Sequence, residues 1–179
     1  MGGPIYIIGQ IFGFVAIVLG ILSYQMKTQK NLILLQFATS VVFCAHYLMI
    51  GAISGMALNI VCALRNLTFW VRSIKGSNDK ITPIIFTVIT AVVGVISWEA
   101  WYSVFIFFGL VINAFCMSFA NPQNIRKSIL VTSPLVMIYD VFSRSYGGFL
   151  YESVAIASSV VGMLRYRKNG GEPEAAKQE

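Results

Sequence analysis

The sequence predicts an all-α integral membrane protein with seven transmembrane helices in one bundle. Only 11% of the 179 residues are charged, 57% are hydrophobic, and the mean hydropathy is +0.76. A soluble domain is about a quarter charged, so a surface this poor in charge must face lipid. Two further observations support this class: long apolar runs recur along the chain, and basic residues gather on alternate sides of them.

The apolar runs are long enough to span the hydrocarbon core, which takes roughly 20 residues of helix. Between Lys30 and Arg65 the chain has no charged residue, and the break at Gly51–Gly55 divides this stretch into two helices. Pro134 lies within the sixth run and is expected to kink it. The predicted helices occupy residues 5–24, 32–50, 55–71, 81–98, 101–119, 125–142 and 148–166.

The basic residues predict the orientation in the membrane, because cytoplasmic loops carry an excess of Lys and Arg. Arg65 lies inside a run, and Arg144 stands alone on the opposite face. The others follow the first, third, fifth and seventh runs: Lys27, Lys30, Arg72, Lys75, Lys80, Arg126, Lys127, Arg165, Arg167, Lys168 and Lys177. We therefore expect the amino terminus outside and the carboxyl terminus in the cytoplasm.

The two ends of the chain resemble each other in the same order. Gly55-x-x-x-Asn59, at the start of the third run, matches Gly148-x-x-x-Glu152 at the start of the seventh. A parallel pair of units is a common plan among transporters. Two further matches are Phe12-Gly13 with Phe108-Gly109, and His46 with Asp140.

These matches predict two parallel three-helix repeats, residues 5–73 and 101–166, joined by a linker helix at residues 81–98. Residues 1–166 then form a single transmembrane domain. The polar stretch 167–179 has too few apolar residues to fold alone and is expected to be a disordered cytoplasmic tail.

The chain also resembles a known family. The residues similar to the YgjV-type family of bacterial inner-membrane proteins are the segment from Leu22-Ser23-Tyr24-Gln25 to Lys30, His46-Tyr47 with Gly51, and Asn59 with Arg65-Asn66. The 3+1+3 order is similar to that of SWEET sugar transporters, PQ-loop proteins and PnuC vitamin-precursor transporters. Pro122-Gln123 resembles the PQ-loop motif, whereas the first repeat has Thr28-Gln29 there. The resemblance implies the fold more strongly than a transport cycle.

Polar side chains inside membrane helices are costly, so they are expected to face the bundle interior or a cavity. Six of them form the predicted substrate-binding site between the repeats: His46, Asn59, Arg65, Asn113, Asp140 and Glu152.

Several of these residues have an alternative interpretation. Arg65 is either a fixed cation for a substrate or a side chain that reaches the nearby headgroups. Glu152 is a proton acceptor, a substrate ligand or a partner for His46. Asp140 is alternatively an interfacial i,i+4 partner of Arg144. A lone histidine such as His46 is more often a core residue with satisfied hydrogen bonds.

The leading functional hypothesis is a small-solute transporter or facilitator of the bacterial inner membrane, with alternating access between the repeats. The alternative is a non-transporting receptor or assembly partner with the same fold, as in the KDEL-receptor branch.

Other classes are not expected. No HExxH, GxSxG or P-loop motif is present, which argues against an enzyme. A single histidine argues against a multi-histidine metal site, and no cofactor is predicted. The scattered basic residues argue against nucleic acid. Gly9-x-x-x-Gly13, with Gly20 below it, predicts a close-packing face, either for a homodimer or for packing within the chain.

Overall fold

The computed structural model describes residues 3–25, 29–76, 81–116 and 122–168, and in these ranges the chain forms seven helices and no strand. The all-α prediction is therefore confirmed. Each helix begins and ends within a few residues of a predicted run, except that residues 117–119 of the fifth run lie outside the described ranges. The helices are α1 (Pro4–Gln25), α2 (Gln29–Ile50), α3 (Ile53–Lys75), α4 (Ile81–Ile96), α5 (Ser103–Cys116), α6 (Pro122–Phe142) and α7 (Tyr146–Lys168).

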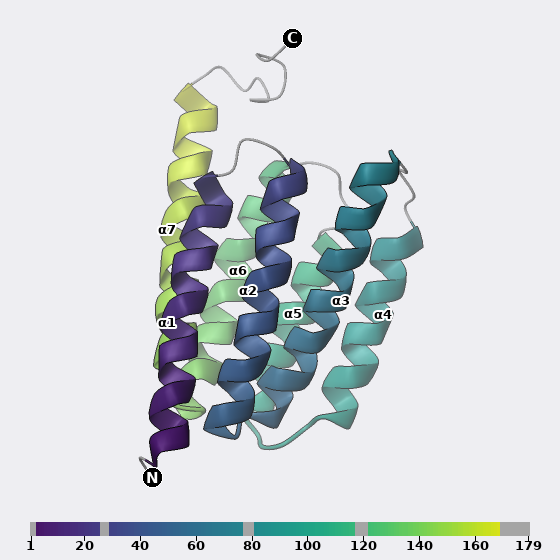
Figure 1. Cartoon of the computed structure of the whole chain (residues 1–179). Helices are drawn as coiled ribbons and strands as arrows, with labels where there is room; N and C mark the ends of the chain where they lie inside the picture. The colour runs from purple at the N-terminus through teal and green to yellow at the C-terminus, as the bar shows by residue number, and fades with distance from the viewer. Residues whose placement is uncertain (1–2, 26–28, 77–80, 117–121, 169–179) are drawn as a thin grey trace.

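Successive helices run antiparallel, so α1, α3, α5 and α7 point one way and α2, α4 and α6 point the other (Figure 1). Helices adjacent in the chain pack against each other, α1 also packs along α7, and α3 touches α5. The bundle therefore closes on itself. α4 packs against α3 and α5, beside the α1–α3 and α5–α7 units. We call the end where α1 begins, with the turns at 51–52 and 143–145, the N-terminal end.

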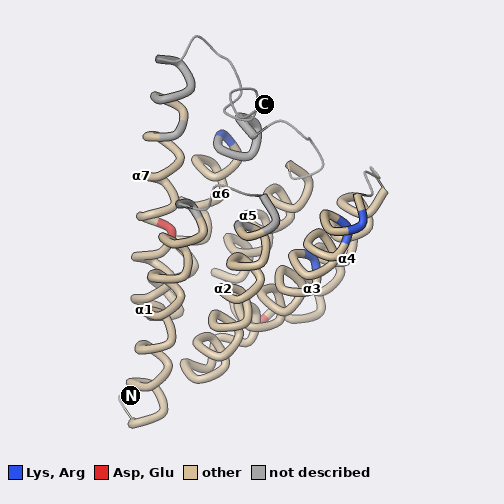
Figure 2. Tube along the Cα trace, turned by 45° about the horizontal axis from the view of Figure 1, so that its top comes forward, with Lys and Arg blue, Asp and Glu red and all other residues tan. Residues whose placement is uncertain are grey.

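Few residues of the described chain are charged (Figure 2), and many large apolar side chains are exposed on the outside of the bundle. Ile5, Ile96 and Leu164, on three different helices, expose 65%, 79% and 61% of their surface. A soluble monomer rarely exposes so much contiguous apolar surface. This exterior suits contact with lipid tails.

Two helices of the described chain are long and apolar enough, by length and composition, to cross a membrane. The spans are Pro4–Ser23 and Ile33–Ile50, whereas Ile81–Ile96 and Ser103–Cys116 are apolar but shorter. α3, α6 and α7 bury polar side chains against their neighbours, and these side chains lower the mean hydropathy of the helices. Seven membrane crossings therefore stay a prediction.

The glycine face of α1 is used inside the chain. A Cβ on Gly13 would stand 2.8 Å from the Cα of Gly147 at the start of α7, so the two backbones meet where only glycine fits. Gly9 faces Met49 of α2, and Gly20 faces Tyr151 of α7. This face holds α1 against α2 and α7, and the homodimer stays a prediction.

α6 continues as a helix on both sides of Pro134, which the sequence analysis expects to kink it. The buried apolar core joins α1, α2, α3, α5 and α6, and the partly buried Tyr151 of α7 packs against it. Its members include Ala16, Phe43, Tyr47, Leu58, Ile106, Val136, Tyr139.

Candidate functional site

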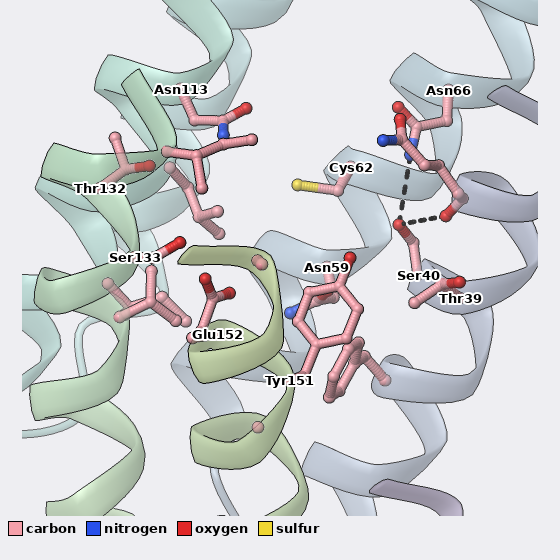
Figure 3. A pocket seen from close by; sticks show the side chains of 18 of the residues that line it. Thr39, Ser40, Asn59, Cys62, Asn66, Asn113, Thr132, Ser133, Tyr151 and Glu152 are labelled. Atoms are coloured by element: carbon pink, nitrogen blue, oxygen red, sulfur yellow. Dashed lines mark hydrogen bonds between the residues drawn. The ribbon is translucent and has the colours of Figure 1, made fainter. Parts of the chain in front are cut away.

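A cavity of about 140 Å³ lies between α2 and α3 on one side and α5, α6 and α7 on the other. Much of its wall is polar, although the outside of the bundle is apolar. A concave site with convergent polar groups inside a membrane bundle is the expected place for a ligand. The polar lining residues are Gln36, Thr39, Ser40, Tyr47, Asn59, Cys62, Arg65, Asn66, Asn113, Thr132, Ser133, Tyr151 and Glu152 (Figure 3).

The acidic part of the wall is formed by Glu152, Ser133 and Asn59. Glu152 lies six residues past the start of α7, and the hydroxyl of Ser133 on α6 points toward its carboxyl (Figure 3). Asn59 lies six residues past the start of α3. Its Nδ2 donates to the carbonyl of Gly55 at 2.9 Å, which leaves Oδ1 available as an acceptor.

The basic part of the wall is formed by Arg65 and Asn66, which are 6% and 3% exposed. Nδ2 of Asn66 donates to Oγ of Ser40 at 3.3 Å, whereas Oδ1 of Asn66 and Nε of Arg65 have no hydrogen-bond partner in the protein. Buried polar atoms normally have partners, and leaving one unpaired is costly. Arg65 is thus a buried residue of the cavity wall, and water or a solute is its expected partner.

Four predicted site residues thus share the cavity wall, namely Asn59, Arg65, Asn113 and Glu152. The other two predicted residues, His46 and Asp140, lie apart from it. They are buried at the N-terminal end of the bundle, 0% and 1% exposed.

His46 and Asp140 join helices together. Nδ1 of His46 lies 2.7 Å from the carbonyl oxygen of Gly9 on α1, and Nε2 lies 2.7 Å from Oγ of Ser145 before α7. The hydroxyl of Tyr47 donates to Oδ1 of Asp140 at 2.7 Å. This arrangement favours the alternative of a core histidine with satisfied hydrogen bonds. It also turns the Asp140 carboxyl inward, whereas Arg144 is exposed.

Two tyrosines were not predicted: Tyr47, which lines the cavity toward the N-terminal end, and Tyr139, which packs against Tyr47. Their ring centroids lie 6.1 Å apart, and the Tyr139 hydroxyl accepts a hydrogen bond from the backbone N–H of Gly55 at 2.8 Å. Each tyrosine lies three residues before the end of its helix, α2 or α6. Aligning the two helices from their ends would have paired these tyrosines. That alignment separates His46 from Asp140 by two positions.

The hydroxyl groups of the wall were also missed. Thr39 and Ser40 donate to the carbonyls of Leu35 and Gln36 in their own helix, at 2.8 and 2.9 Å. Such local hydrogen bonds are ordinary for Ser and Thr in any helix. The sequence therefore gives no signal that separates these residues from other buried hydroxyls.

The described residues hold no group of three or more His, Cys, Asp or Glu side chains that could bind a metal ion. The chemistry of the wall rests on amides, hydroxyls, the Glu152 carboxyl and the Arg65 guanidinium. Such groups can hold a polar ligand by hydrogen bonds and charge.

An apolar exterior around a polar cavity defines a membrane protein with a ligand-sized interior site. Residues 7–170 match the Imp-YgjV family, described as bacterial inner membrane protein, and the chain belongs to this family. The predicted family resemblance and the inner-membrane location are thus confirmed. No curated protein matches the chain, and no solved structure matches it. The likeness to SWEET, PQ-loop and PnuC proteins stays a prediction.

Proposed function

We propose that this inner-membrane protein carries a small polar solute across the membrane through the cavity between α2–α3 and α5–α7. The observation that carries the proposal is the polar wall itself. In a membrane protein, a buried arginine without a partner is expensive and is expected to line a substrate or ion pathway. Arg65 meets this description through its unpaired Nε, and Glu152, which hydrogen-bonds Ser133, lines the same cavity from the other unit of the bundle.

The proposal includes seven membrane crossings with the N-terminal end outside. Among the basic residues with described side chains, Arg72, Lys75 and Lys127 lie at the opposite end of the bundle, which the positive-inside rule assigns to the cytoplasm. A reporter fused after Lys168 should therefore be cytoplasmic.

An external cysteine gives the complementary test of topology. Ile53 at the start of α3 is 56% exposed, whereas the neighbouring Ser54 is 1% exposed, so Ile53→Cys is the better position. A membrane-impermeant thiol reagent should modify it only from outside. Modification only from the cytoplasm would contradict this topology and indicate the opposite orientation.

The proposal also includes two parallel repeats, with one unit rocking against the other around the cavity. A rotation of about 180° about the membrane normal exchanges the α1–α7 contact with the α5–α3 contact, and both contacts exist. Several wall residues occupy matching positions, counted from the ends of their helices. These pairs are Asn59 with Glu152, Ser40 with Thr132, and Cys62 with Ala155.

A cavity-filling variant tests transport without knowledge of the substrate. Proteoliposomes are loaded with an isotopically labelled mixture of amino acids, sugars, nucleosides and carboxylates, and release is followed by mass spectrometry. At least one solute should leave faster than from empty liposomes. Ser133→Phe, which places a ring in the cavity, should abolish this release. Val131→Phe is the matched control, because Val131 lies on the same helix and is 58% exposed.

A protein that binds a solute but releases none would instead be the non-transporting receptor or assembly partner. Binding that is lost in Ser133→Phe, without any faster release by the unmodified protein, would support that alternative. If Ser133→Phe releases the solute as fast as the unmodified protein, the cavity is not part of the transport pathway.

A further inference from the structure

We infer that the solute is a small zwitterion of amino-acid size, whose carboxylate binds Arg65 and whose ammonium group binds Glu152. This inference rests on the proposed function and names the class of solute for the same cavity.

The two charges of the wall are not paired with each other. Glu152 has Ser133 as its hydrogen-bonding neighbour, and Nε of Arg65 has no partner in the protein. An anionic solute would satisfy Arg65 but would place like charge in a cavity that also holds the carboxyl of Glu152. A cationic solute would pair with Glu152 but would place like charge near the guanidinium of Arg65. A zwitterionic solute compensates the charges of both Arg65 and Glu152. A purely anionic or cationic solute leaves one of these charges uncompensated in a buried site, and the cavity therefore discriminates against it.

The depths of the two residues suit such a solute. Arg65 lies twelve residues past the start of α3 and Glu152 six past the start of α7. At 1.5 Å per residue their backbones differ in depth by about 9 Å. Helical side chains lean toward the start of their helix, and the longer Arg65 side chain therefore shortens this separation. The two charged groups are thus offset along the bundle on opposite walls of the cavity, and a solute that joins them must carry its charges at its two ends.

The neighbours of each charge match the two ends of a zwitterion. An ammonium group donates three hydrogen bonds. Near Glu152 the wall offers Oδ1 of Asn59 and Oγ of Ser133 as further acceptors. A carboxylate accepts hydrogen bonds, and Arg65 supplies the unpaired Nε–H. The Glu152 end of the cavity therefore offers acceptors to an ammonium group, and the other end offers the guanidinium of Arg65 to a carboxylate.

The volume limits the size of the solute. The cavity of about 140 Å³ is close in size to an engineered cavity that holds one benzene molecule. It has room for roughly six to nine non-hydrogen atoms, whereas a hexose has about twelve. A hexose is therefore too large for this cavity, whereas an amino-acid-sized solute fits it.

A series of ω-amino acids tests the inference, because their two charges are separated by increasing lengths of chain. Glycine, β-alanine and γ-aminobutyrate are titrated into the purified full-length protein in detergent, and binding is followed by calorimetry. The best binder is compared with the carboxylate and the amine that each lack one charge, which for β-alanine are propionate and ethylamine. Each should bind at least tenfold more weakly, although neither is larger than the zwitterion.

Two variants test which residue binds which charged group of the solute. Glu152→Gln should reduce the preference for the zwitterion over the carboxylate, and Arg65→Gln should reduce its preference over the amine. Glu99→Gln is the control, because Glu99 is exposed outside the cavity, and it should leave both preferences unchanged. A circular-dichroism melt confirms that each variant is folded.

The outcomes separate the inference from the proposed function. If the carboxylate or the amine binds as tightly as the amino acid, the inference that the solute is a zwitterion is wrong. If no member of the series binds while proteoliposomes still release another solute, the inference fails and transport stands. If no solute binds and none is released, both fail.

Discussion

The N-terminal end of the bundle and the cavity both bury polar side chains, but these side chains differ in their hydrogen-bond partners. At the N-terminal end both ring nitrogens of His46 have partners at 2.7 Å, and Tyr47 donates to Asp140, although Oδ2 of Asp140 is an exception without a partner. In the cavity, Nε of Arg65 has no partner. Burial of a polar group therefore does not mark a site by itself. A wall with unpaired hydrogen-bonding atoms and space beside them does.

The comparison predicts that changes at the N-terminal end cost stability. Gly147→Ala should have the largest effect, because its Cβ would meet the backbone of Gly13 and α1 would have to move. We expect a loss of about 2–4 kcal/mol in unfolding free energy, measured by denaturation in mixed micelles. Gly3→Ala is the control, since a Cβ there meets nothing within 4 Å. Equal stability of the two variants would show that the α1–α7 contact is loose.

A smaller loss is expected for Tyr47→Phe. The variant removes the 2.7 Å hydrogen bond to Asp140 and leaves a buried carboxyl without that donor. The expected loss is about 1–2 kcal/mol, in the range for a hydrogen bond between membrane helices and a buried acceptor left unpaired. Tyr146→Phe, at a residue that is 61% exposed, should change the stability by less than about 0.5 kcal/mol. No difference between the two phenylalanine variants would mean that the cluster does not hold the end together.

The smallest effect on stability is expected in the cavity. Arg65→Gln removes a buried charge that has no ion pair within the described chain, so the unfolding free energy should stay within about 1 kcal/mol or rise. The same variant should lose most of the thermal shift caused by a bound solute. A large destabilisation without solute would assign Arg65 a structural role like that of His46.

The sequence predicted the helices well, because apolar runs and their breaks are local features of the chain. It placed the charge of Arg65 and Glu152 inside the bundle for the same reason. It could not distinguish His46 and Asp140 from the cavity residues, since that depends on which helix lies opposite. Tyr47 was overlooked because an aromatic residue near the end of a membrane helix is ordinary.

The pairing of His46 with Asp140 shows how a repeat is misread by one half-turn of helix. The two residues lie four and two positions before the ends of their helices, so they do not correspond in register. Matching by chemical type selected two polar residues, whereas the tyrosines share the register. The helix ends, which only the structure gives to within a residue, would have corrected the alignment.

Access to the cavity from the two sides of the membrane tests the central claim most directly. Ser133→Cys is introduced in a chain whose Cys44, Cys62 and Cys116 are replaced by alanine, and a small membrane-impermeant thiol reagent is added to either side of oriented membranes. Alternating access predicts modification from both sides, slower from the outside because the N-terminal end is closed in this structure, and slower from both sides once a solute is bound. Modification from one side only, at a rate that no solute changes, would contradict the account.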